Sequence, residues 1–270
     1  MTTKLIVTTW NYTDVTDSND HILLKSFKKL NPTTDIVNIH FNRGRYSRLE
    51  HAYQLLYGYQ YEFLLYRIEL LYHEIKQIDT DFLILCDTSD CTCVSNIDGL
   101  VDLFDLENNV IFGCETNQWP MPMVKQNWVD YSDYDENHHN NKTYVNAGGI
   151  LASKKKFIEL LDIGREVLLS KQYVFGQSRE SDQRYGGTGS DQGLFTWVYN
   201  MKKDSPIKLD TEGKFLINTY GRSLDDYYVE NNKLYSKVTG EPTFFVHDNG
   251  WHHGSPRFHD NLELTKLYLD

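Results

Sequence analysis

Short apolar segments alternate with longer amphipathic segments in the first half of the chain, and this alternation limits the possible folds most strongly. The amphipathic segments place apolar residues at helical spacing, as in residues 20–30 and 62–77. In 62–77 we expect Arg67 among the polar residues away from the apolar face. The short apolar segments predict strands at 5–9, 36–41, 82–86 and 110–113. Because helices that connect strands favour a parallel sheet, we expect an α/β fold with a mainly parallel central sheet.

The second half of the chain is less regular. Helices are predicted at residues 154–170 and 191–199, and long polar segments at 130–141 and 171–189 are of a length typical of functional or mobile loops. We find no internal repeat and no linker-like composition. The 270 residues therefore predict a single domain, 1–270, which suits one large α/β unit.

The net charge excludes one class of partner. A formal charge of −11 opposes approach to a polyanion, so nucleic acid is not expected to bind. A diphosphate ligand would need a local cation, supplied by a metal or by a basic cluster.

The first residues run directly into an apolar strand-like segment, so we expect neither a signal peptide nor a membrane anchor. We expect a soluble chain, cytoplasmic as encoded, or in the host cytoplasm if the source is viral; a homodimer is left open. The cysteines lack the paired spacing of a zinc ribbon and are expected to be reduced core thiols: Cys86, Cys91, Cys93 and Cys114.

Two carboxylates, Asp87 and Asp90, follow the apolar strand 82–86. Ligands of open α/β sheets bind at the carboxyl ends of strands, and closely spaced oxygen ligands suit Mg²⁺ or Mn²⁺. The alternative is that both residues cap a turn.

A second apolar strand ends at His247, which is followed by Asn249 and Gly250. A neutral imidazole there can complete the ligands of a cation, and the Asn-Gly turn lets the backbone approach a phosphate. The alternative is an ordinary hydrogen-bonded histidine. Asp248 is expected to point to the other side of the extended chain.

Two further positions suggest sugar chemistry. Glu115 and Trp119 follow strand 110–113 and could grip the hydroxyls and the apolar face of a sugar, or they could be a surface charge and a core residue. Asp191 lies in the first turn of a predicted helix, where the dipole favours a carboxylate, although it could also act as a general base.

Five motifs occur in one order along the chain: Asp87-x-x-Asp90, Glu115-x-x-x-Trp119-Pro120, Tyr144 to Gly149, Asp191-Gln192 with Phe195-Thr196, and His247-x-Asn249-Gly250. This order resembles the glycosyltransferase domain of the procollagen lysyl hydroxylase and collagen glycosyltransferase family, over about residues 5–253. The resemblance implies a GT-A type, Rossmann-like αβα sandwich, with a nucleotide-binding half (1–115) and a half for acceptor and sugar (116–270).

The resemblance also implies roles for individual residues. Manganese, with magnesium as the alternative, would be bound by Asp87, Asp90 and His247. The nucleotide-sugar would contact Thr8 or Thr9 near the uracil ring and Asn249 and Gly250 beside the diphosphate. The transferred sugar and the acceptor would lie near Glu115, Trp119, Asn146, Gly148, Asp191 and Gln192.

The chain departs from the family pattern at two nucleotide-binding positions. Ser89 stands where the family has a tyrosine against the nucleoside, and His253 stands where it has a lysine that reaches the phosphates. The family's run of acids before glutamine is reduced to Asp191. Donor affinity and the identity of the catalytic base are the properties that these departures affect.

The sequence thus favours transfer of a hexose, galactose or glucose, from a UDP-sugar to a hydroxyl acceptor. Hydroxylysine or galactosyl-hydroxylysine of a collagen-like protein, or another glycan, would be that acceptor, with Asp191 or Glu115 as the base if the configuration inverts. One alternative is a catalytically degenerate module that binds a UDP-sugar or glycan. Another is a metal-dependent hydrolase that uses His247, His252, His253 and His259.

Overall fold

The computed structural model describes residues 1–10, 22–41, 63–88, 90–115, 144–170, 191–219, 224–231, 233–237 and 239–249. The polar segments predicted at 130–141 and 171–189, and the histidines at 252, 253 and 259, lie outside these ranges.

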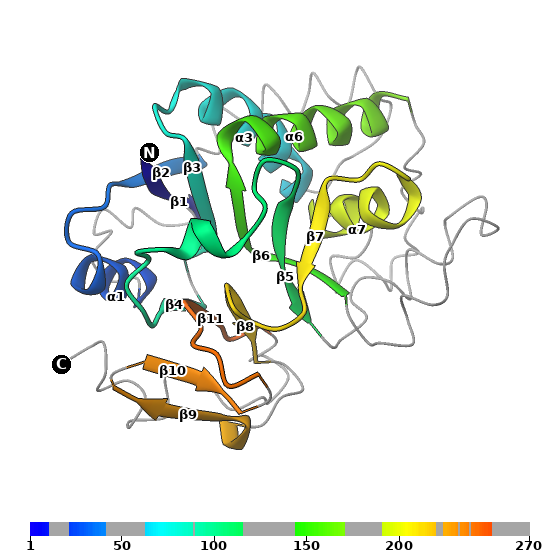
Figure 1. Cartoon of the computed structure of the whole chain (residues 1–270). Coiled ribbons are helices and arrows are strands. Elements are labelled where there is room, and N and C mark those ends of the chain that lie inside the picture. The colour runs from blue at the N-terminus through cyan, green and yellow to red at the C-terminus, as the bar shows by residue number, and fades with distance from the viewer. Residues whose placement is uncertain are drawn as a thin grey trace.

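The described residues form one large sheet of nine strands, in the order β2-β1-β3-β6-β5-β8-β11-β4, with β7 also paired to β5 (Figure 1). Most neighbouring strands are parallel, whereas β6 is antiparallel to both β3 and β5, and β4 is antiparallel to β11. The strands are β1 (Thr3–Trp10), β2 (Ile36–Phe41), β3 (Phe82–Asp87), β4 (Cys91–Cys93), β5 (Val110–Glu115), β6 (Tyr144–Ser153), β7 (Ile207–Asp210), β8 (Leu216–Asn218) and β11 (Phe245–His247). The predicted α/β fold with a mainly parallel sheet is confirmed.

The strands predicted from apolar runs are present as β1, β2, β3 and β5. The sequence does not predict the ten-residue strand β6, although part of it forms one of the five motifs. Eight of its residues are buried, so no alternation of polar and apolar side chains marks the strand. Its pair Gly148-Gly149 further weakens the strand signal, since glycine disfavours strands.

In the part of the chain that the structure describes, four helices flank the sheet: α1 (Ile22–Leu30), α3 (Phe63–Gln77), α6 (Lys154–Leu169) and α7 (Asp191–Met201). Helices α3, α6 and α7 pack together over one face, in a core that includes Ile6, Leu85 and Phe112. Helix α1 and the short helix η2 (Leu100–Leu103) cover the other face, where Leu5 and Val7 point. The alternation along β1 therefore divides the core into two layers.

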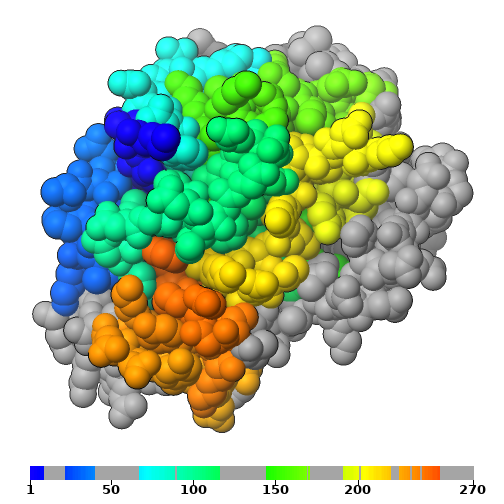
Figure 2. Space-filling model, in the orientation of Figure 1, coloured from blue at the N-terminus to red at the C-terminus, as the bar shows by residue number. Residues whose placement is uncertain are grey.

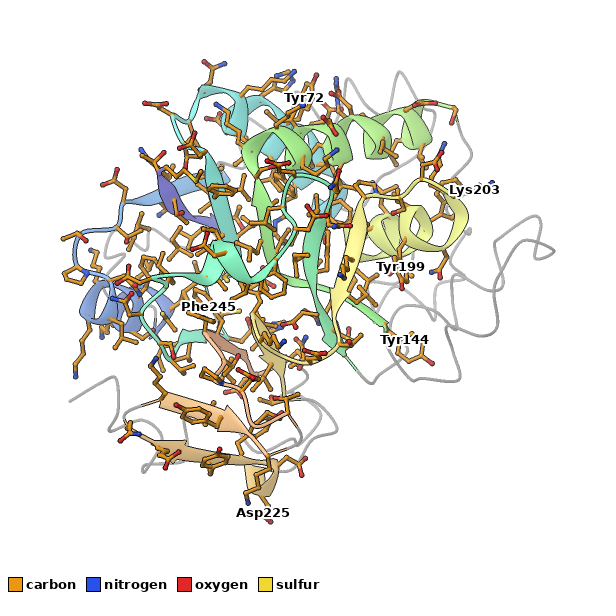
Figure 3. The ribbon with its side chains drawn as sticks, in the orientation of Figure 1. Tyr72, Tyr144, Tyr199, Lys203, Asp225 and Phe245 are labelled. Atoms are coloured by element: carbon orange, nitrogen blue, oxygen red, sulfur yellow. The ribbon has the colours of Figure 1, made fainter. Side chains whose placement is uncertain are left out.

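Aromatic packing fixes β11 within the second layer. Phe245, labelled in Figure 3, is fully buried between Phe27 of α1, with ring centroids 6.3 Å apart, and Phe215, at 5.6 Å. Because Phe245 lies two residues before His247 on a three-residue strand, this packing also sets where the histidine stands.

A two-stranded hairpin, β9 (Tyr227–Glu230) and β10 (Lys233–Ser236), follows the short helix η4 (Leu224–Asp226). Its residues Tyr227 and Leu234 pack on Val94, Ile217 and Val246 of the main sheet region. In Figure 2 the hairpin occupies one end of the visible face, beside the segment that contains β8. The hairpin thus supports the strands that end at the site.

No helix among the described residues is long and apolar enough to cross a membrane. All four cysteines are free and buried, as predicted.

Candidate functional site

The side chain of His247 is held in one orientation by amide groups. Its Nδ1 lies 2.8 Å from Oδ1 of Asn218 and 3.1 Å from Oδ1 of Asn146. Those two oxygens face the ring because the amide nitrogens are engaged elsewhere: Nδ2 of Asn218 donates to the carbonyl of Cys114, and Nδ2 of Asn146 donates to Glu115. Nδ1 therefore bears a proton, and Nε2 is the atom that the ring presents to a partner.

The partner of Nε2 is Asp90. Its Oδ2 lies 3.3 Å from Nε2 of His247, and both side chains are largely buried. Burial lowers the pKa of His247, but the acidic groups around it, Asp90 first and then Cys91 and Asp87, together raise that pKa well above its ordinary value. The imidazolium and the carboxylate thus neutralise each other here.

Gly148 lies against the imidazole ring of His247. A Cβ built at this position would lie 2.1 Å from Cε1 of His247 and 2.5 Å from its Nδ1. The amide of Gly148 donates to Oδ1 of Asn146 over 2.9 Å, and so joins the same network. A residue with a side chain would displace the ring.

Glu115 is a buried carboxylate surrounded by three amide side chains. Its Oε1 accepts from Asn146 at 3.1 Å and from Gln192 at 2.8 Å, and its Oε2 accepts from Asn249 at 2.8 Å. Burial raises the pKa of Glu115 to about 7, although the three amide donors lower it. A carboxyl group with that pKa can gain or lose a proton near neutral pH.

The acids Asp87 and Asp191 are joined by Arg67 of α3. The Arg67 guanidinium lies 3.2 Å from Oδ1 of Asp87 and 3.1 Å from Oδ2 of Asp191. The prediction that Arg67 lies away from the apolar face was wrong, because the residue is only 4% exposed. Burial lowers the pKa of Arg67, yet the two carboxylates together raise it. Burial also raises the pKa of Asp191, against the effect of Arg67.

Thr8 lies at the same edge of the sheet, opposite Asp87 in the β1–β3 register. It is buried, and its hydroxyl has no hydrogen-bond partner among the described residues. Of Thr9 only the backbone is described, paired with His40 in β2. An unpaired buried hydroxyl at a strand end is a ready contact for a ligand.

Asp248 points away from this cluster, as predicted, and its carboxylate accepts from the Thr219 hydroxyl at 3.0 Å. Four other predicted site residues lie outside the described residues: Ser89, Trp119, Gly250 and His253.

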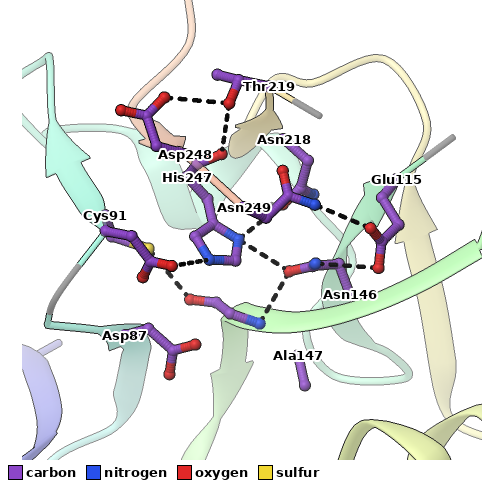
Figure 4. Close-up of polar contacts among 12 residues, drawn as sticks. Asp87, Cys91, Glu115, Asn146, Ala147, Asn218, Thr219, His247, Asp248 and Asn249 are labelled. Carbon is purple, nitrogen blue, oxygen red and sulfur yellow. Dashed lines mark hydrogen bonds and ion pairs between the residues drawn. The ribbon is translucent and has the colours of Figure 1, made fainter. Parts of the chain in front are cut away.

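Cys91 was not predicted to take part in the site. It stands opposite His247 in the β4–β11 register, and its Sγ, the Asp90 carboxylate and a ring nitrogen of His247 lie within 4.8 Å of one another. Asp87 lies beside this group in Figure 4, but its Oδ1 accepts from Arg67. The sequence signal for Cys91 is its position directly after Asp90, whereas its pairing opposite His247 is seen only in the structure.

No known family model and no curated protein matches the sequence. The fold, in contrast, resembles many solved structures. A glycosyltransferase involved in glycosylation of the major capsid of PBCV-1 matches over 97% of this chain and 99% of its own, with 8% identity and a TM-score of 0.47. The galactosyltransferase LgtC, solved in complex with donor and acceptor sugar analogues, matches over 98% and 95%, with 14% identity and a TM-score of 0.51.

The bifunctional glycosyltransferase WbbM matches over all of this chain and 52% of its own, with 12% identity and a TM-score of 0.52. At these identities the likeness concerns the fold. The chain therefore has a Rossmann-like fold of the GT-A type, which is the fold expected from its sequence.

Proposed function

We propose that the protein is a metal-dependent glycosyltransferase that moves a hexose from a UDP-sugar to a hydroxyl acceptor. The observation that supports this most directly is the meeting of Asp90 and His247 at the edge of a GT-A sheet, with their side-chain atoms 3.3 Å apart. These residues lie far apart in the sequence, and the β4–β11 pairing brings their strands together.

The residues present fit a divalent cation. Asp90 offers a carboxylate oxygen, and His247 offers Nε2 because Nδ1 is committed to Asn218 and Asn146. Asp87, the third ligand suggested by the sequence, lies close by, but to bind the ion it would have to share its carboxylate with Arg67. Mn²⁺ and Mg²⁺ are the ions that the sequence suggests and the first to test, and a bound divalent cation would neutralise the charge that develops on the departing UDP.

The remaining polar residues have proposed places around the donor. The unpaired hydroxyl of Thr8 would meet the nucleoside, with Thr9 and Ser89 nearby in sequence. Asn249 and the turn residue Gly250, followed by His253, would lie beside the diphosphate. The sugar and acceptor would occupy the side lined by Glu115, Asn146, Gly148, Gln192 and Trp119.

Glu115 is better suited than Asp191 to accept the acceptor's proton in an inverting reaction. Oxygens of Asp191 accept from Arg67 and from the backbone amide of Gln192 at 2.9 Å, and an arginine partner disfavours proton uptake. Glu115, with a pKa of about 7, accepts hydrogen bonds from the neutral amide groups of Asn146, Gln192 and Asn249. We therefore assign Glu115 as the base and Asp191 as a residue that positions Arg67.

The resemblance to collagen glycosyltransferases makes hydroxylysine of a collagen-like protein the first acceptor to test, with other glycans next.

A second function is favoured by one observation. Arg67 already neutralises Asp87 and Asp191, which suits a module that binds a UDP-sugar without turnover.

A donor screen separates these functions. UDP release is measured for each UDP-sugar with Mn²⁺ and again after chelation, in the wild type, in Asp90→Asn and in the exposed control Asp98→Asn. Transfer predicts release with one donor that stops on chelation and in Asp90→Asn but persists in Asp98→Asn. Saturable UDP binding without release identifies the binding module, and neither binding nor release contradicts both functions.

A further inference from the structure

Cys91 has no place in the proposed reaction, although its sulfur stands within reach of the cation-binding side chains. Its Sγ lies within 4.8 Å of the ligand atoms of Asp90 and His247. This thiol donates a weak hydrogen bond to the carbonyl of Gly148, with 3.3 Å between sulfur and oxygen.

We propose that Cys91 is a third protein ligand of the cation, and that the site therefore takes Zn²⁺ or Co²⁺ in preference to Mn²⁺ or Mg²⁺. This inference rests on the proposed metal site and changes its chemistry. Thiolate and imidazole ligands select zinc and similar ions, whereas carboxylates and carbonyls suit manganese and magnesium.

The spacing of the three side chains fits a small ion. With bonds of about 2.0 to 2.3 Å, the ligand atoms around a tetrahedral zinc ion lie roughly 3.3 to 3.8 Å apart. Nε2 of His247 and Oδ2 of Asp90 are already 3.3 Å apart. The sulfur needs only a small movement to complete the set, because Cys91 stands directly opposite His247 on the neighbouring strand.

The ion pair of Asp87 leaves the third position to Cys91. Oδ1 of Asp87 accepts from Arg67, whose side chain is only 5% exposed. Breaking this buried ion pair to free Asp87 would be strongly destabilising. Asp90, Cys91 and His247 then form a set of three protein ligands. Three protein ligands leave one position of a tetrahedral ion open, and an oxygen of a diphosphate can fill it.

Binding forms a bond between the metal and Sγ and releases the thiol proton to solvent. A metal ion provides the charge that stabilises the thiolate in this buried position.

Cobalt(II) titration of the metal-free protein tests the inference, because sulfur coordination produces a charge-transfer absorption that oxygen and nitrogen ligands do not. We expect this absorption to saturate at one cobalt per chain in the wild type. The matched control is Cys93→Ser. Cys93 lies two residues along the same strand, and its sulfur contacts Asn31 and the carbonyl of Ser95 instead. The absorption should persist in Cys93→Ser and vanish in Cys91→Ser. In Cys91→Ser the ratio of zinc affinity to manganese affinity should also fall at least about tenfold.

Cobalt binding without the sulfur absorption in the wild type, or an absorption that persists in Cys91→Ser, would overturn the assignment of Cys91. Either result leaves metal-dependent UDP release intact. No binding of any divalent cation would instead remove the metal from the proposed function. The wild-type spectrum decides the question even if Cys91→Ser fails to fold.

Discussion

Gly148 lies directly against the imidazole of His247, so that a Cβ at position 148 would stand 2.1 Å from Cε1 of the ring. The glycine is required by this close approach, since real Cβ atoms do not tolerate such a distance from a neighbouring side chain. The ring cannot simply turn away, because Asn218 and Asn146 hold its Nδ1.

Gly148→Ala should therefore destabilise the protein by about 1 to 3 kcal/mol and displace His247 from Asp90. Chemical denaturation measures the first effect, and cation affinity measures the second. Gly164→Ala is the control, because its added methyl meets only the end of the Leu194 side chain, at 3.3 Å. Normal cation affinity in a folded Gly148→Ala protein would contradict the geometry.

Glu115 should make stability depend on pH. Its pKa rises from an ordinary 4.5 to about 7 in the folded protein, so the folded state holds a proton that the unfolded state has lost between these values. Its stabilising contribution is complete below about pH 4.5 and is lost as the pH rises through about 7, by on the order of 3 kcal/mol.

Glu115→Gln should flatten that part of the pH profile of unfolding free energy, and should lower transfer about 10²- to 10⁴-fold if Glu115 is the base. In the wild type, transfer should rise with pH through about 7, as the carboxylate form appears. Glu166→Gln, an exposed residue of α6, is the control that should change neither profile. An unchanged unfolding profile in Glu115→Gln would contradict the pKa assignment.

Removing Arg67 should be costly, because it leaves the carboxylates of Asp87 and Asp191 unpaired. Arg67→Met should reduce the free energy of unfolding by about 3 to 5 kcal/mol at neutral pH. Addition of Asp191→Asn should restore part of this loss, since one of the two repelling charges disappears.

Arg165→Met is the matched control for Arg67. Arg165 pairs with Glu69 at 2.7 Å but its side chain is 27% exposed, so a loss of about 1 kcal/mol is expected. Thermal and denaturant unfolding measure both variants. Equal losses for the two arginines would show that Arg67 is not a buried bridge.

Asp210 should be important for the position of β8. Its carboxylate accepts from the backbone amides of Lys214, Phe215 and Leu216 at 3.0, 2.7 and 3.0 Å. These bonds fix the turn before the strand that ends at Asn218.

Asp210→Ala should cost about 3 kcal/mol or more, since several buried amides lose their acceptor. It should also weaken cation binding, because Asn218 orients His247. Asp204→Ala, at an exposed position in the preceding loop, should leave both properties unchanged. A stable Asp210→Ala protein with normal cation affinity would argue against this role.

The part of the structure that follows from local sequence was predictable. Apolar runs marked β1 and β3, and the acids after β3 pointed to the carboxyl edge of the sheet. The pairing of β4 with β11 was not predictable, because nothing local in Cys91–Cys93 indicates a partner near residue 245. The prediction for Arg67 was wrong for a similar reason. A charged residue on a helix is normally exposed, and only the positions of Asp87 and Asp191 in space explain its burial.

Strand β11 is the last described strand in the chain, yet it lies inside the sheet, between β8 and β4. The edge strand β4 is hydrogen-bonded to β11. It can therefore join the sheet only after the chain near residue 247 has been synthesised. During synthesis, most of the fold can assemble while Asp90 still lacks His247. Under the proposed function, cation binding then becomes possible only after β11 has been made, and a chain interrupted before this strand would lack the proposed ligand His247.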